Sequence, residues 1–148
     1  NICHERQDMK VYILEDKSKS VQINDLLHVL SPHSPEIDEE RLDMLLHEKD
    51  FRLFAAEAAE GIMAGMLTLT RCQTLAMSKY WIEDVIVSPE FRGQGIGRAL
   101  VEAAINHVKD TDEQSTIYLT SNPSRQAART LYRSVGFEEY ETGVFRMI

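Results

Sequence analysis

The sequence predicts a single domain of the α+β class, built around a mixed β-sheet. Its 148 residues are enough to bury a core, and an apolar share of 43% beside a charged share of 27% is typical of a soluble globular protein. Strand patterns dominate the first part of the chain, and alternating strand and helix patterns follow. This order of elements favours an α+β architecture or a mixed sheet.

The first half of the chain is expected to hold two helices and three strands. Leucines share one face of a helix over residues 20–30, and two prolines within residues 31–35 interrupt the chain after it. Asp38 is a suitable N-cap for a second helix that reaches about residue 47. Strands are expected at 10–15, 51–57 and 62–69, the last two forming a hairpin across a turn at Gly61.

The second half alternates strands with amphipathic helices. A strand at 80–87 precedes a helix at 97–109 that buries one apolar face. A helix at 124–135 ends before Gly136, a residue type common just after a helix. The remaining strands are expected at 116–121, 137–140 and 144–148.

The domain is expected to span residues 9–148. Residues 1–8 lack the apolar core of a signal peptide and precede Met9, so we interpret them as upstream or appended sequence. Cys3 and Cys72 are the only cysteines, which fits a reducing cytoplasm better than a disulfide framework. No metal site is expected, because neither the cysteines nor the five scattered histidines have ligand spacing.

Charge and hydropathy narrow the range of partners. A net charge of −8 repels phosphate backbones, so no nucleic-acid partner is expected. The same charge suits a cationic substrate such as an amine, although plain solubility explains it equally well. No apolar run is long enough to span a membrane, and we expect no membrane partner and a monomer or homodimer.

Three glycines after the strand at 80–87 predict an anion-binding loop. Glycine allows positive φ and close approach of the backbone to a ligand. A strand, a glycine loop and a helix in this order direct free N–H groups and the positive helix end at a phosphate or pyrophosphate. A P-loop is excluded because no Lys follows the glycines, which stand at Gly93, Gly95 and Gly97. Their spacing also departs from the dinucleotide-binding Gly-x-Gly-x-x-Gly pattern.

The segment Arg92-Gly93-Gln94-Gly95-Ile96-Gly97 resembles the acyl-CoA pyrophosphate motif of the GNAT superfamily of N-acetyltransferases. A second resemblance covers residues 125–137, where Ala128, Leu131, Tyr132, Gly136 and Phe137 match a family motif. The family's order of elements also agrees with residues 9–148. The resemblance implies the GNAT fold, with a twisted, mostly antiparallel sheet splayed between its fourth and fifth strands. It also implies acetyl-CoA as co-substrate.

The resemblance implies that Tyr132 acts as the catalytic acid. A phenol has a pKa of about 10 and can donate a proton to a leaving thiolate at neutral pH. Without the glycine loop upstream, an aromatic core residue would be the better interpretation. The family's usual Asn position holds Arg125, while Asn122 lies three residues earlier, so the contact to the pantetheine arm comes from Asn122 or is lost.

Glu83 is the candidate base that removes a proton from the incoming amine. Strand alternation is expected to place Trp81, Glu83, Val85 and Val87 on one face, where apolar neighbours would raise the pKa of a carboxyl. Asp84 is expected to point the other way and is the second choice. A structural carboxylate or a substrate anchor remains an alternative for Glu83.

Further residues are expected around the cofactor by resemblance. The backbone of Val85 and Val87 would pair with the pantetheine amides, and one N–H would hold the acetyl carbonyl oxygen. Arg129 and Arg133 are either contacts to the adenine or 3′-phosphate, or solvated helix residues. The remaining expected cofactor contacts are Arg92, Gly93, Gln94, Gly95, Gly97, Arg98, Asn122, Arg125, Ala128 and Tyr132.

The sequence therefore predicts a cytoplasmic GNAT-type N-acetyltransferase that transfers acetyl from acetyl-CoA directly to a primary amine of a small molecule or peptide. Three alternatives remain open: an enzyme using a longer acyl-CoA, a non-catalytic acyl-CoA sensor, and a nucleotide-binding regulator. The segment at 30–46 is expected to form part of the acceptor wall, where the acidic cluster at 36–40 fits a cation.

Overall fold

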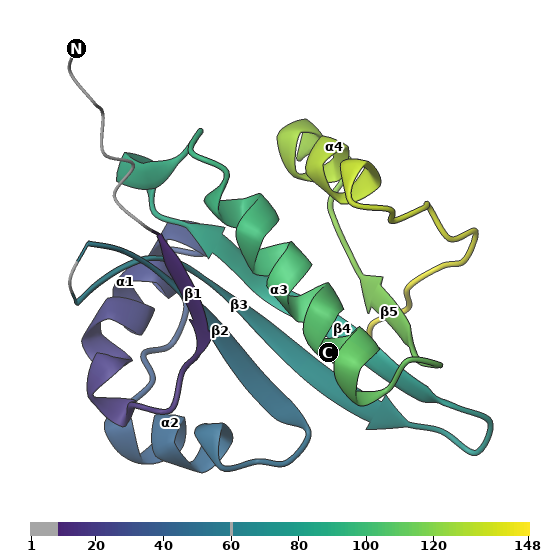
Figure 1. Cartoon of the computed structure of the whole chain (residues 1–148), viewed down its shortest axis with the longest axis horizontal. Helices are drawn as coiled ribbons and strands as arrows, with labels where there is room; N and C mark the ends of the chain where they lie inside the picture. The colour runs from purple at the N-terminus through teal and green to yellow at the C-terminus, as the bar shows by residue number, and fades with distance from the viewer. Residues whose placement is uncertain (1–8, 60) are drawn as a thin grey trace.

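A five-stranded sheet forms the centre of the computed structural model, which describes residues 9–59 and 61–148 (Figure 1). The strands lie in the order β1-β2-β3-β4-β5, and only β4 and β5 pair in parallel. Their bounds are β1 Lys10–Ile13, β2 Phe51–Ala59, β3 Ile62–Gln73, β4 Ser78–Val87 and β5 Thr116–Leu119. Residues 1–8, with the predicted upstream segment and Cys3, lie outside the described residues.

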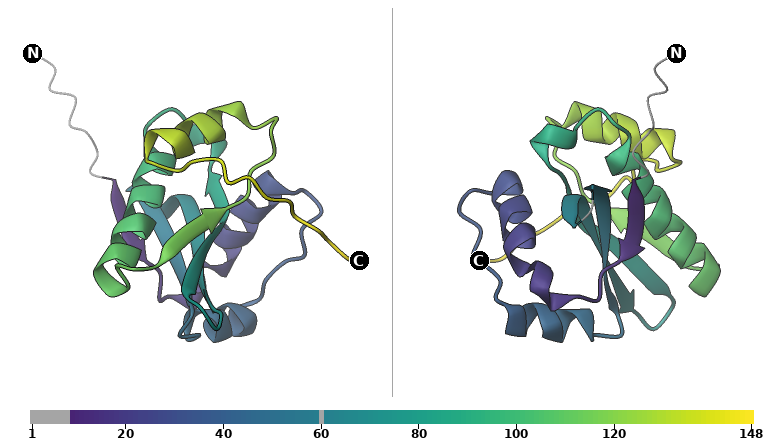
Figure 2. Two further views of the ribbon diagram at one scale, coloured as in Figure 1. Left: turned by 90° about the vertical axis from the view of Figure 1, so that its right-hand side faces the viewer. Right: turned by 60° about the vertical axis from the view of Figure 1, so that its left-hand side comes forward.

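Helices cover both faces of the sheet, as the right-hand view of Figure 2 shows. α1 (Ser20–Leu30) and α2 (Glu39–Leu46) pack on one face around a core that includes Leu26, Leu42 and Ile86. α3 (Ile96–Thr111) packs on the other face, in a larger core. α4 (Gln126–Ser134) follows β5, and the 3-10 turns are η1 (Lys17–Lys19) and η2 (Pro89–Phe91). We call these two sides the α1/α2 face and the α3 face.

The expected α+β class and most expected elements are confirmed. The Asp38 side chain accepts a hydrogen bond from the Arg41 N–H at 2.8 Å, as expected of the N-cap of α2. Gly61 forms the β2–β3 turn with a φ of 74°, and the hairpin continues beyond the expected strand ends. Within the described residues, no helix is long and apolar enough to cross a bilayer.

The two strands expected at 137–140 and 144–148 do not form, so this prediction is wrong. Glu139 instead pairs with Arg129 and with Arg133, which lies 3.6 Å away, and these contacts hold the segment after α4 against that helix. The Tyr140 ring meets the ring of Tyr118 on β5 edge-on at 6.0 Å. Beyond it the apolar side chains of Val144, Phe145, Met147 and Ile148 are almost fully exposed.

β4 and β5 separate half-way along β4. The parallel pairing runs from Lys79 opposite Thr116 to Ile82 opposite Leu119, where β5 ends. β4 continues to Val87 with only β3 beside it on the sheet. The expected splay between the fourth and fifth strands is therefore confirmed. We call residues 78–82 the paired half of β4 and residues 83–87 its free half.

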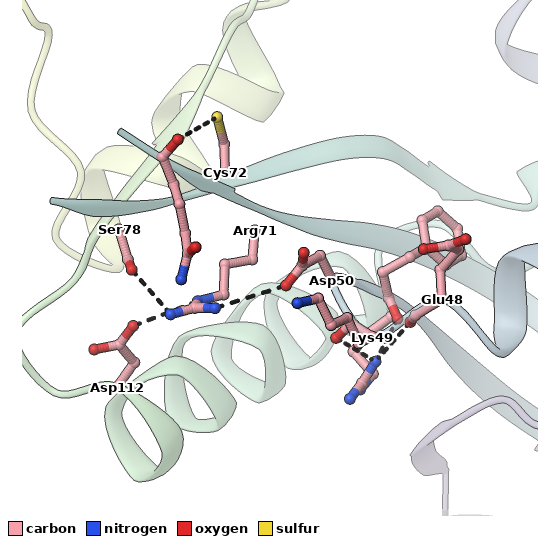
Figure 3. Close-up of polar contacts among 10 residues, drawn as sticks. Glu48, Lys49, Asp50, Arg71, Cys72, Ser78 and Asp112 are labelled. Carbon is pink, nitrogen blue, oxygen red and sulfur yellow. Dashed lines mark hydrogen bonds and ion pairs between the residues drawn. The ribbon is translucent and has the colours of Figure 1, made fainter. Parts of the chain in front are cut away.

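Arg71 of β3 fixes the paired half of β4 to its neighbours (Figure 3). Its guanidinium donates to the Ser78 hydroxyl at 3.0 Å and lies 3.7 Å from the carboxylates of both Asp50 and Asp112. These contacts join the start of β4 to the start of β2 and the end of α3. The surface hollow beside Arg71 has balanced charges and lies at the opposite end of β4 from the glycine loop.

Candidate functional site

The free half of β4 begins with a β-bulge. Thr68 of β3 lies opposite Glu83, but Met66 lies opposite Ile86, so two residues of β4 face one residue of β3. Asp84 adopts a φ of 51°, the only positive φ of a non-glycine residue in the described chain. Asp tolerates this region better than most residues, and bulges of this kind redirect side chains.

The bulge corrects the expected strand alternation. Tyr80 and Ile82 lie in the core of the α3 face, so Trp81 and Glu83 are directed to the α1/α2 face. Val85 and Val87 do not share that face as expected, because they pack against the α3-face core. The extra residue shifts the alternation by one position.

The bulge also brings Asp84 to the side of Glu83. The Thr68 hydroxyl, which is buried on the α1/α2 face, donates to the Asp84 carboxylate at 3.0 Å. Asp84 therefore does not point away from Glu83, as strand alternation had predicted. Two carboxylates of consecutive residues now lie on one face of the sheet.

The surroundings of Glu83 change the basicity of its carboxyl group. Glu83 is exposed by surface area, but neighbouring atoms partly desolvate its carboxyl; this desolvation, and secondly the negative charge of Asp84, raise the pKa of the Glu83 carboxyl above its usual value. A carboxylate with a raised pKa is a stronger base than an ordinary one. Thr68 holds Asp84 in place, so the neighbouring charge is a fixed part of the site.

The main chain of the free half points its hydrogen-bonding groups to the side that β5 has left. The Ser88 N–H donates to the Ala64 carbonyl on β3 at 2.7 Å, and the Ile86 carbonyl lies against Gly65 of β3. Because successive residues of a strand alternate their partners, the amides of Val85 and Val87 face away from β3. These groups lie where an extended ligand could add to the sheet edge.

The glycine loop leads from this edge to the N-terminus of α3. Gly93 and Gly95 have φ values of 76° and 80°, and a Cβ at either position would meet no atom within 4 Å. Gly95 is the N-cap of α3 and has no side chain that could accept from the first N–H groups of the helix. The loop and the helix end can therefore bind an anion through main-chain N–H groups.

Tyr132 of α4 lies on the other side of the opening. It is 7% exposed, belongs to the α3-face core against which Val85 and Val87 pack, and meets the Phe137 ring edge-on at 6.1 Å. Burial raises the pKa of the Tyr132 phenol, and the positive charge of Arg125 acts in the opposite direction. The phenol therefore stays protonated at neutral pH, as a proton donor must.

Several arginines expected at the cofactor are bound to other side chains. Arg98 donates to Glu102 at 2.9 Å and to the Ser134 hydroxyl at 3.0 Å, tying α3 to α4. Arg129 and Arg133 pair with Glu139. Arg92 and Gln94 are exposed in the loop. Arg98 can still offer its main-chain N–H to the anion site, whereas its guanidinium is engaged.

The comparison with known families assigns the chain. Residues 15–137 match the family described as the acetyltransferase (GNAT) family. The chain belongs to the GNAT family. The GNAT acetyltransferase assignment predicted from the sequence is thus confirmed at the level of the family, and the matched range covers every element from α1 to α4.

Individual relatives are distant and longer than the matched region. The N-alpha-acetyltransferase RimI of Mycobacterium tuberculosis is 30% identical over 78 residues, which is 53% of this chain and 47% of that protein. The chain spans less than half the length of the curated relatives it matches. An aminoglycoside acetyltransferase from an uncultured soil metagenomic sample, solved with trehalose, has a TM-score of 0.81 at 23% identity and covers 95% of this chain and 96% of its own.

Another solved structure has the same GNAT fold. AAC(6')-Iy in complex with the bisubstrate analogue CoA-S-monomethyl-acetylneamine has a TM-score of 0.77 at 20% identity, covering 95% of this chain and 98% of its own. These likenesses confirm the fold. The GNAT sheet and its helices therefore form in this chain as expected from the sequence.

The loop between β5 and α4 contains Asn122, which was expected at the cofactor, and Ser121, which sequence reasoning missed. The Asn122 side-chain oxygen accepts from the N–H and hydroxyl of Ser124, at 2.9 and 2.8 Å, so this oxygen shapes the loop. The hydroxyl of Ser121 is buried and has no partner among the described residues. Ser121 follows β5 where the strands part, which makes it a further candidate contact for the cofactor. Its position next to Asn122 was the only signal in the sequence.

The sequence carries a clearer signal for the bulge in β4 than for Ser121. Apolar residues at Ile82 and Val85 are three positions apart, which breaks the two-residue period of the strand. An Asp inside a strand is a further mark of irregular backbone. The structure thus places Val85 and Val87 of the free half against the core that holds Tyr132, and the glycine loop follows them, while Glu83 lies on the opposite face of β4.

Proposed function

We propose that this chain transfers the acetyl group of acetyl-CoA directly to a primary amine of a small molecule or peptide. The observation that carries the proposal is the free half of β4. Its main chain has no strand partner on one side among residues 9–59 and 61–148, and it continues into a glycine loop at a helix N-terminus. An extended pantetheine arm ending in a pyrophosphate has this same order of hydrogen-bonding groups. RimI of M. tuberculosis, an N-alpha-acetyltransferase by name, supports an amine as acceptor.

The residues present fit acetyl-CoA. Val85 and Val87 offer main-chain groups to the pantetheine amides. Gly93 and Gly95 leave open space above the loop for the pyrophosphate, next to the N-terminus of α3. Asn122 lies in the β5–α4 loop, and Arg125 and Ala128 lie at the start of α4, where they can contact the rest of the arm. We propose the other expected contacts, at residues 92–98, as main-chain donors.

The proposed chemistry divides between the two sides of the opening. Acetyl-CoA supplies a thioester whose carbonyl carbon is attacked by the amine nitrogen. Glu83 takes the proton that the ammonium must lose, directly or through a water. An N–H of Val85 or Val87 donates to the carbonyl oxygen as negative charge develops there. Tyr132 donates its proton to the sulfur as the carbon–sulfur bond breaks.

The proposal is tested by CoA binding to Gly95→Asp. The new side chain places a negative charge where the pyrophosphate is proposed to sit, and affinity should fall at least about 100-fold. Gly61→Asp is the matched control, because Gly61 has a similar φ of 74° and the same open surroundings but lies in the β2–β3 turn. Calorimetry measures both. Equal CoA affinity in the two folded variants would remove the loop from the site.

A further inference from the structure

Three aromatic side chains form a continuous shelf beside the carboxylates. Trp81 of β4 stacks on Tyr118 of β5, with ring centroids 5.2 Å apart and an interplanar angle of 28°. Tyr140, from the segment after α4, meets Tyr118 edge-on at 6.0 Å, where that segment crosses β5 (Figure 2, left). Trp81 and Tyr118 are half-buried, and Tyr140 is 72% exposed. We call these three residues the aromatic shelf.

The shelf lies on the α1/α2 face, next to the proposed base. Trp81 and Glu83 are two residues apart on the same side of β4, because Tyr80 and Ile82 occupy the opposite core. Two residues of an extended strand span about 7 Å. Asp84 reaches the same face through the bulge and its bond with Thr68. A ligand bound at Glu83 therefore has an aromatic surface within one short spacer.

The shelf already binds an ammonium group within the chain. The Lys79 nitrogen lies over the Tyr118 ring, 5.5 Å from its centroid. The negative face of an aromatic ring attracts cations, and Trp attracts them most strongly. Glu138 and Glu141, two residues before and one residue after Tyr140 in the chain, are exposed and acidic.

We propose that the acceptor is a diamine or longer polyamine, whose reacting nitrogen lies at Glu83 and Asp84 and whose second ammonium lies on the aromatic shelf. The inference rests on the proposed acetyl transfer and adds the class of its acceptor. The spacing of about 7 Å along the strand corresponds to two nitrogens joined by four or five methylenes. Carboxylates at one end and aromatic faces at the other match these two charges.

The fluorescence of Trp81 tests the proposal without turnover, because Trp81 is the only tryptophan of the chain. In the presence of CoA, 1,4-diaminobutane should change this fluorescence with a dissociation constant at least about tenfold below that of 1-aminobutane, since only the diamine has a second ammonium. Equal affinities for the two amines would overturn the proposal. CoA affinity, measured separately by calorimetry, shows whether the proposed function itself has failed.

The variant Lys79→Met distinguishes an ammonium group of the acceptor on the aromatic shelf from an anionic group of the acceptor bound by Lys79. If Lys79 competes with the acceptor for the shelf, its removal should tighten diamine binding by about threefold or more. If Lys79 instead binds an anionic group of the acceptor, diamine binding will not tighten and the proposal is overturned. Lys10→Met is the matched control, because Lys10 lies over Tyr12 at 5.2 Å on β1, at the other edge of the sheet. It should leave diamine affinity unchanged.

A second variant tests the shelf through selectivity. Trp81→Leu should reduce the ratio of diamine to monoamine affinity, measured by calorimetry with CoA present, to near one. Tyr12→Leu removes an aromatic ring on β1 and should keep the ratio of the parent. A ratio that survives Trp81→Leu would place the second ammonium elsewhere and overturn the proposal.

Discussion

The two halves of β4 share one neighbour and differ in the other. Residues 78–82 are bonded to β3, residues 79–82 are also bonded to β5, and Arg71 fixes the start of this half to β2 and α3. In the part of the chain that the structure describes, residues 83–87 are bonded to β3 alone; they begin with a bulge and lead into a glycine loop. The paired half stabilises the sheet, whereas the free half exposes main-chain groups and gathers carboxylates. The loss of one neighbouring strand is what leaves main-chain groups of this segment open to a ligand.

The largest expected effect comes from Tyr132→Phe, which keeps the ring and removes the proton donor beside the free half. Turnover with an identified amine should fall about 100-fold or more, while CoA affinity changes little. Tyr80→Phe is the matched control, because Tyr80 is buried to the same extent, at 7% exposure, in the paired half. Steady-state kinetics compare the two variants. Equal turnover in both would return Tyr132 to the role of a core residue.

The next effect comes from Glu83→Gln, which keeps the shape and removes the base. Turnover should fall at least about tenfold, and the acidic limb of the pH–rate profile should flatten. High pH should partly restore turnover, because more of the amine is then neutral. The raised pKa means that ionised Glu83 destabilises the fold above its unfolded pKa, and this destabilisation is relieved as pH falls through the folded pKa. The Tm at pH 7 should therefore not decrease.

The pH–rate profile decides whether Glu83 is the base. Glu113→Gln, at an exposed site between α3 and β5, serves as the control and should keep the parent's profile. If Glu83→Gln also keeps that profile, the base is another group, and Asp84 is then the first to examine.

The smallest expected effect comes from Asp84→Asn, at the bulge where the free half of β4 begins. Asp84→Asn removes one charge, and Asn tolerates positive φ as well as Asp does. Without the negative neighbour the pKa of Glu83 should fall, so the acidic limb of the pH–rate profile should move to lower pH. Turnover on the plateau should change less than about tenfold. A limb that stays in place would show that Asp84 does not act on the base.

The sequence predicted the regular elements well because their cues are local. Asp38 caps α2 through its own side chain, and Gly61 turns the β2–β3 hairpin through its own φ. The final strands at 137–140 and 144–148 were predicted from apolar alternation, which does not include the distant pairing of Glu139 with Arg129 and Arg133. Alternation indicates that a segment can form a strand but not that a partner strand is beside it.

The candidate site residues stay a prediction, and part of their expected geometry was wrong. The glycine loop and Tyr132 carry local motifs, and the structure places Tyr132 in the core against which Val85 and Val87 pack. The faces of Val85, Val87 and Asp84 were wrong because one inserted residue reverses every later position on a strand. The engagement of Arg98 by Glu102 and Ser134 depends on how α3 meets α4, which no local pattern encodes.

The most direct test of the account is the hydrogen exchange of the β4 amides, followed by NMR with and without CoA. In the free protein the amides of Val85 and Val87 should exchange faster than those of the paired half, because they lack a strand partner. Saturating CoA should shift both amide signals and slow their exchange, while Tyr80 and Ile82 change little. Unchanged exchange at Val85 and Val87, in a sample that calorimetry shows to be saturated with CoA, would contradict the assignment of the free half as the cofactor edge.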